Sequence, residues 1–127
     1  KYIEAGSDIV YANTFGANRY KLKNHSVDEI IGAGIAIAKR ACNGKALAAL
    51  DIGPIGQLLE PTGTLKFEEA YDIFKEQIIA GRDADVIVFE TMTDLYELKA
   101  AVLAARENLR KIREPLQAAV YPQWLLR

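Results

Sequence analysis

Short apolar runs recur along the chain and predict three strands. They cover residues 7–11, 45–50 and 85–90, and none of them alternates regularly with polar positions. Runs of this length and composition are typical of parallel strands that are buried on both faces. The strand starts near residues 7, 46 and 85 are spaced by about 39 residues (46 − 7 and 85 − 46), which indicates a regular strand–helix repeat.

Helical periodicity follows each of these strands. Ser26 and Glu29 have the capping-box spacing at the start of the first helix, and Asn43 and Gly44 mark its end. The apolar residues of this helix at helical intervals are Ile30, Ala33, Ile37 and Ala41. The second helix is predicted to begin at an N-cap formed by Thr64. Its core face is predicted to contain Phe67, Ala70, Tyr71, Phe74 and Ile78.

The third helix is predicted from Asp94 to about Glu107. Its apolar stripe is expected to contain Leu95, Leu98, Val102 and Ala105. Residues 108–114 are compatible with an extension of this helix, and residues 116–121 are compatible with a further short strand.

Polar residues at the ends of the predicted strands indicate the architecture. Asn13 and Thr14 follow the first strand, Asp51 follows the second and Glu90 ends the third. A doubly wound sheet should carry one glycine-rich phosphate turn, whereas neither GxGxxG nor GxxxxGK[ST] occurs. The predicted fold class is therefore α/β, a partial (β/α)8 TIM barrel of about three consecutive βα units with parallel strands. A closed barrel needs eight units in roughly 250 residues, so open sheet edges are expected here, and open edges favour homo-oligomers.

Composition and charge narrow the possible functions. The chain has 127 residues, half of them apolar, and a formal net charge of −1. Interspersed charges give no indication of nucleic-acid or membrane-surface binding. The single cysteine, Cys42, excludes an internal disulfide framework and suits a cytoplasmic location. The first residues resemble the end of a helix, so the chain is interpreted as a fragment of a larger enzyme.

Three colinear blocks carry a family resemblance. They are YIEAGSDIVYANTFGANRYKL (2–22), ALDIGPIGQLLEPTGTLKFEEAY (49–71) and DVIVFETMTDLYELKAAVLAARE (85–107). Together they resemble the homocysteine S-methyltransferase family, and most closely the homocysteine-binding domain of its cobalamin-dependent methionine synthase branch. The resemblance implies a zinc-dependent barrel of which residues 1–108 form about units two to four. It also implies methyl transfer to the homocysteine thiolate in methionine synthesis, with methylcobalamin as the favoured donor.

The resemblance assigns a substrate-binding role to some residues at the strand ends. Glu90 matches the glutamate that binds the ammonium group of homocysteine. Asn13 and Thr14 match the NTF signature, and their side chains either reach the substrate carboxylate or fix their own loop. Asp51 either contacts the substrate or caps the following turn. The zinc-binding cysteines of the family have no counterpart here, so no catalytic residue or metal ligand is predicted and the chain is expected to be inactive alone.

The resemblance ends abruptly after residue 108, so residues 109–127 are interpreted as a divergent C-terminal tail. A non-catalytic alternative therefore stays open. In that alternative the chain is an orphan half-barrel that acts as a self-associating or small-metabolite-binding module.

Overall fold

A four-stranded parallel sheet organises the chain. The computed structural model describes the backbone of residues 1–112 and 117–121 and the side chains of residues 1–109. In chain order the elements are β1 (Ile9–Tyr11), α1 (Arg19–Leu22), α2 (Val27–Cys42), β2 (Leu47–Ile52), α3 (Phe67–Ala80), β3 (Val86–Glu90), α4 (Leu95–Ile112) and β4 (Gln117–Tyr121). The predicted α/β class with parallel strands is confirmed. Among the described residues no helix is long and apolar enough to cross a membrane.

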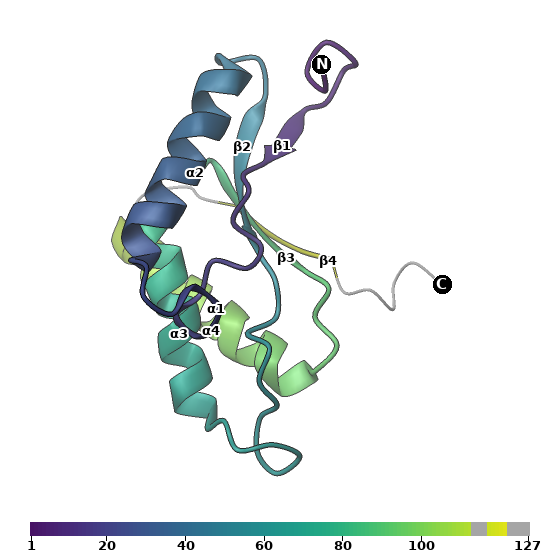
Figure 1. Cartoon of the computed structure of the whole chain (residues 1–127). Helices are drawn as coiled ribbons and strands as arrows, with labels where there is room; N and C mark the ends of the chain where they lie inside the picture. Colours follow the sequence, from purple (N-terminus) through teal and green to yellow (C-terminus); the bar gives the residue numbers. More distant parts are fainter. Residues whose placement is uncertain (113–116, 122–127) are drawn as a thin grey trace.

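The strands lie in the sheet in the order in which they occur along the chain. The sheet order is β1-β2-β3-β4, and all three pairings are parallel. Leu50 is paired with Ile87, and Asp51 with Val88. Figure 1 shows the helices gathered on one side of the sheet. Because the strands are parallel, all their carboxyl ends lie at one edge of the sheet, where the loops after β1, β2 and β3 meet.

Alternation along the strands divides the buried side chains into two clusters. Leu50, Ile52 and Phe89 belong to the main core on the helix-covered face, whereas Ala49 and Val88 belong to a smaller cluster on the opposite face. The Phe89 ring packs edge-on against Phe74 of α3, with the ring centroids 6.4 Å apart and the planes at 86°. Aromatic pairs of this geometry are favourable beyond their buried area, so this contact fixes α3 against the sheet.

The α2 helix confirms the predicted capping box but buries a different stripe. The Ser26 side chain accepts a hydrogen bond from the backbone N–H of Glu29, and Asn43 ends the helix in a left-handed conformation. Ile30 and Ile37 are exposed. The buried residues of α2 are Val27, Ile31, Ile35, Ala38 and Cys42. Two apolar stripes run along this helix, and helical spacing alone does not tell which one faces the sheet.

The other two helices depart from the predictions in part, α3 at its N-cap and α4 in its buried face. The N-cap of α3 is Lys66, without a side-chain cap, so the prediction of Thr64 was wrong. The predicted α3 face is confirmed at its buried positions Ala70, Phe74 and Ile78. In α4 the predicted stripe is confirmed in part, because Ala105 is buried and Leu98 packs against the core, whereas Leu95 is 68% exposed. The buried residues of α4 are Glu97, Ala100, Ala101, Ala104, Ala105 and Asn108.

The C-terminal part of the chain continues the strand–helix order. Helix α4 extends to Ile112, beyond the predicted end near Glu107. The strand β4 pairs with β3 from Val86↔Gln117 to Glu90↔Tyr121, in agreement with the short strand expected at 116–121. The predicted tail, 109–127, falls partly on residues 113–116 and 122–127, which lie outside the described residues.

Candidate functional site

Two carboxylates lie side by side at the carboxyl edge of the sheet. Asp51 is the fifth residue of β2, and Glu90 is the last residue of β3. Asp51 pairs with Val88, two residues before Glu90, so strand alternation places both acids on the face opposite the helices. Asp51 is 6% exposed and Glu90 is partly buried. The sheet thus brings together two acids that are 39 residues apart in the chain (90 − 51).

The environment of Asp51 disfavours its charge. Burial, and then the negative charge of Glu90, raise the pKa of the Asp51 carboxyl to about 7. Its Oδ1 atom is buried and accepts no hydrogen bond within the described part of the chain. A buried acceptor without a donor costs about 1–3 kcal/mol. A cationic hydrogen-bond donor placed between Asp51 and Glu90 would remove this cost and the repulsion between the two acids.

The loop after β1 lies beside this pair. Thr14 is 1% exposed, and its hydroxyl donates to the backbone carbonyl of Asp51 (2.9 Å) and accepts from the backbone N–H of Asp51 (3.0 Å). The Thr14 hydroxyl therefore fixes the backbone that carries the Asp51 carboxyl. The side chain of Asn13, next to it, is exposed at the same edge of the sheet.

Backbone strain follows Glu90 directly. Thr91 has φ +60°, a left-handed conformation that is unfavourable for a β-branched residue. The next residue, Met92, is buried in the core, and the Asp94 side chain then caps α4 by accepting from the backbone N–H of Tyr96 (2.7 Å). Strained residues of this kind are concentrated at binding sites. The turn at Thr91 ends β3 at Glu90 and redirects the chain into α4.

The loop after β2 is held by side chains to which sequence reasoning gave no role. Glu97 of α4 is 4% exposed, and its Oε1 accepts from the backbone N–H of Ile55 at 2.7 Å. Lys21 Nζ donates to the carbonyl of Pro54 (2.7 Å), and Asn18 Nδ2 donates to the carbonyl of Ile55 (3.4 Å). All three belong to the quoted blocks. An acid at a core-facing position of α4 was the sequence signal that could have identified Glu97.

The same loop contains a glycine that its surroundings require. A Cβ atom added at Gly53 would lie 2.3 Å from the ring of Phe15, and the Gly53 N–H donates to the Phe15 carbonyl at 3.1 Å. The ring thus packs directly on the backbone just after β2. The Nζ atom of Lys21 lies over the Phe15 ring, 5.6 Å from the ring centroid.

The described residues do not fit a zinc ion. None of their His, Cys, Asp and Glu side chains form a group of three or more that could hold a metal. Cys42 is buried in the last turn of α2, among the residues of the main core. Tetrahedral zinc needs several such ligands together, so no step proposed for these residues passes through a metal.

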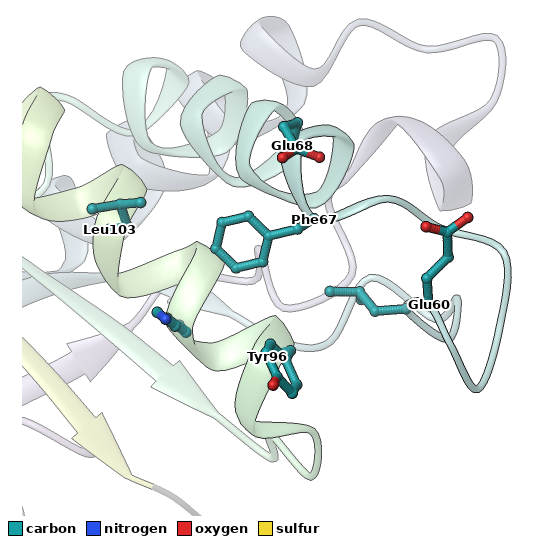
Figure 2. A pocket seen from close by; sticks show the side chains of 7 residues that line it. Glu60, Phe67, Glu68, Tyr96 and Leu103 are labelled. Carbon is teal, nitrogen blue, oxygen red and sulfur yellow. The ribbon is translucent and has the colours of Figure 1, made fainter.

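A separate hollow lies on the helical side of the molecule. It encloses about 530 Å³ and is lined by Leu59, Glu60, Phe67, Glu68, Tyr96, Lys99 and Leu103. Figure 2 shows the Phe67 ring pointing from α3 toward α4, while the Glu60 carboxylate lies on the loop before α3. The hollow includes neither Asp51 nor Glu90. The strand-end carboxylates are the better candidate for a binding site because they combine burial with an unpartnered polar atom.

Comparisons with known proteins agree with the motifs. The family model described as homocysteine S-methyltransferase matches residues 1–124. A methionine synthase of Mycobacterium leprae is 33% identical over 121 residues, covering 86% of this chain and 10% of that protein. A methionine synthase of Mycobacterium tuberculosis is 34% identical over 122 residues, covering 87% of this chain and 10% of that protein. The chain thus spans about a tenth of the length of these relatives.

Proposed function

Because this chain belongs to the homocysteine S-methyltransferase family, we propose that it forms the part of a methionine-synthesising methyltransferase that binds the ammonium group of homocysteine. The family predicted from the three blocks is confirmed. Methyl transfer to the homocysteine thiolate is the proposed activity of the whole protein. The proposed role of residues 1–108 is to bind and orient the amino acid at the carboxyl edge of the sheet.

The Asp51 Oδ1 atom, which lies beside Glu90 and has no hydrogen-bond partner among the described residues, is the observation that carries this proposal. An ammonium group has three N–H donors and a positive charge, so it can donate to both carboxylates at once. Binding would give Asp51 Oδ1 the donor that it lacks in the described structure and would favour the ionised form of Asp51. The amino acid would then be oriented by two fixed points on neighbouring strands.

The loop after β1 has two roles in this proposal. Asn13, which is exposed at the edge, offers its side-chain amide to the substrate carboxylate. Thr14 holds the Asp51 backbone through both hydrogen bonds of its hydroxyl. Its proposed role is therefore to position Asp51 and not to contact the substrate. Glu90 and Asp51 are the proposed contacts to the ammonium group.

The complete reaction needs groups that the described residues do not hold. In the proposed whole protein, activation of the thiol would depend on a zinc ion and the methyl group would come from methylcobalamin. The ligands of both would lie outside this chain. What this chain contributes is the position of the homocysteine backbone, and a fixed orientation of one reactant lowers the barrier of a bimolecular reaction.

We also propose that the sheet is a segment of a (β/α)8 barrel. The strands keep their chain order without a reversal, and the helices lie on one side of the sheet (Figure 1). A doubly wound sheet reverses its strand order and carries helices on both faces. In a barrel the face opposite the helices points inward, and Asp51 and Glu90 would open toward the ligand-binding end.

Calorimetric titration of the 127-residue chain with L-homocysteine tests the ammonium site. Glu90→Gln should weaken binding by about 10- to 100-fold, because it removes one charge-assisted contact worth roughly 1.5–3 kcal/mol. The matched control is Glu68→Gln, an exposed acid in the first turn of α3, which should leave the affinity unchanged.

The ligand itself supplies a second control. The deamino analogue of homocysteine keeps the thiol and the carboxylate but lacks the ammonium group. It should bind the parent chain and the Glu90→Gln variant equally weakly. If Glu90→Gln binds homocysteine as tightly as the parent chain does, the ammonium site is wrong.

Exposed apolar residues at one edge of the sheet favour a second candidate function, self-association. Ile9 of β1 and Leu47 of β2 are 41% and 49% exposed. Within the described residues β1 and β4 each pair with one neighbour, so both outer strands present backbone groups for pairing. The proposed alternative is a non-catalytic module that associates with further copies of itself.

A further inference from the structure

The short turn after β2 is surrounded by side chains from the loops on either side of it. This turn, Gly53–Ile55, begins two residues after Asp51. The loop after β1 and helix α1 contribute the carbonyl of Phe15 and the side chains of Asn18 and Lys21. Helix α4, which follows Glu90, contributes the side chain of Glu97. The turn is therefore the place where the three strand-end loops are joined.

We propose that Glu97 is a positioning residue that holds the Gly53–Ile55 turn and thereby keeps Asp51 and Glu90 apposed for ligand binding. The hydrogen bond from the Ile55 N–H to Glu97 Oε1 is 2.7 Å long and buried. Ile55 lies four positions after Asp51, and Glu97 lies seven positions after Glu90. The hydrogen bond therefore connects the segment that follows Asp51 to the segment that follows Glu90.

The cost of burying Glu97 indicates that the contact serves more than α4 itself. Among the buried α4 residues, Glu97 is the one acid, and the neighbouring core positions are alanines. Burial raises the pKa of the Glu97 carboxyl, whereas the hydrogen bond from Ile55 and the nearby Lys21 charge act in the opposite direction. An apolar residue at this position would avoid the desolvation cost but would leave the buried Ile55 N–H without an acceptor.

The proposed role of Glu97 adds a supporting contact to the ammonium site. It rests on the proposed function only for the identity of the ligand, homocysteine. Lys21 holds the same turn at the preceding residue, since its Nζ donates to the carbonyl of Pro54 at 2.7 Å. A turn fixed at Pro54 and Ile55 leaves little freedom to the end of β2. Small displacements of a positioned group reduce affinity and rate strongly.

Two substitutions at the same position separate positioning from general stability. Glu97→Gln keeps a side-chain oxygen that accepts from Ile55, whereas Glu97→Met keeps the length and removes the acceptor. The matched control is Asn108→Ala on the same helix, where buried Nδ2 donates to the carbonyl of Ala104 (2.8 Å) far from the turn. This control loses a buried polar contact without affecting the loop after β2.

Two measurements on the ligand-free chain decide the inference. In Glu97→Met, hydrogen exchange of the Ile55 amide should be about 10-fold faster or more. The titration midpoint of the Asp51 carboxyl, followed by carbon NMR, should fall toward its ordinary value because the released turn admits water. In Glu97→Gln, the exchange rate of the Ile55 amide and the titration midpoint of Asp51 should both stay at the parent values. Exchange and midpoint that respond equally to Glu97→Met and Asn108→Ala would overturn the positioning role.

Affinity for L-homocysteine is the third readout. It should fall by about 10-fold or more in Glu97→Met, and it should stay at the parent value in Glu97→Gln and Asn108→Ala. A parent chain that binds no homocysteine contradicts the proposed function, while the two ligand-free readouts still decide the role of Glu97. An affinity that falls equally in Glu97→Met and Asn108→Ala counts against positioning.

Discussion

At the scale of single residues, the molecule is marked by acids that are buried at some cost. Asp51 has an oxygen without a hydrogen-bond partner among the described residues and Glu90 as its neighbour, and Glu97 is buried against the backbone of Ile55. Such groups are costly for stability and are therefore informative about function. The sequence placed Asp51 and Glu90 at strand ends correctly. Sequence reasoning gave Glu97 no role, because its hydrogen-bond partner is a backbone amide 42 residues away.

The raised pKa of Asp51 predicts how stability depends on pH. Folding raises this pKa from 3.8 to about 7, so between these values the folded chain binds more protons than the unfolded chain. The contribution of Asp51 to the free energy of unfolding therefore falls as pH rises from about 4 to about 7, by at most about 4 kcal/mol. Above about pH 7 both states are ionised and the contribution is constant.

The variant Asp51→Asn isolates this contribution. Relative to the parent chain, its free energy of unfolding should be larger by about 1–3 kcal/mol at about pH 8 than at about pH 5. Urea unfolding at both pH values measures the difference, and the contributions of other acids cancel in the comparison. An equal difference at both pH values would show that Asp51 titrates normally.

At the scale of elements, periodicity predicted the helices, the strands and the buried face of α3 well, but it chose the wrong face of α2. In α2 both apolar stripes have helical spacing, and the sheet selects the one that contains Ile31 and Ile35. In α4 the buried apolar residues are alanines, which allow a close approach of helices, while the larger Leu95 remains exposed. Hydrophobic size in the sequence therefore failed at Leu95 and Val102, whereas Ala105 of the predicted stripe is buried. Tertiary packing, rather than local propensity, decides such cases.

The contact between Gly53 and Phe15 predicts a large effect of one methyl group. Gly53→Ala places a Cβ atom 2.3 Å from the Phe15 ring, so the ring or the loop has to move. The free energy of unfolding should decrease by about 1–3 kcal/mol, the usual cost of overpacking. In a chain that also carries Phe15→Leu, the same change should cost less. Thermal unfolding of the four chains of this cycle measures the coupling, and strict additivity would contradict the proposed contact.

At the scale of the whole molecule, the chain presents a binding edge without the groups for the complete reaction. The described residues contain no cluster suited to a metal ion. We therefore predict that residues 1–127 alone do not transfer a methyl group to homocysteine, even with added zinc and methylcobalamin. Methionine formation measured by mass spectrometry checks this, with an intact family member as the positive control. Zinc-dependent turnover by this chain would contradict the division of roles.

The open edge of the sheet predicts association in solution. Sedimentation velocity of the chain should show a discrete oligomer at concentrations where Leu47→Lys sediments as a monomer, because the added charge would be buried at the interface. Lys66→Glu, a charge change at the exposed N-cap of α3, is the control and should behave like the parent chain. A monomeric parent chain would remove the alternative function but would not affect the ammonium site.

Carbon NMR of the Asp51 and Glu90 carboxyl groups during titration with L-homocysteine tests the central claim most directly. We predict that both carboxyl signals shift together and saturate at the same ligand concentration. The Asp51 midpoint should also fall below its ligand-free value, because an ammonium group favours the ionised acid. Signals of both acids that stay unchanged while homocysteine binds elsewhere on the chain would contradict the account.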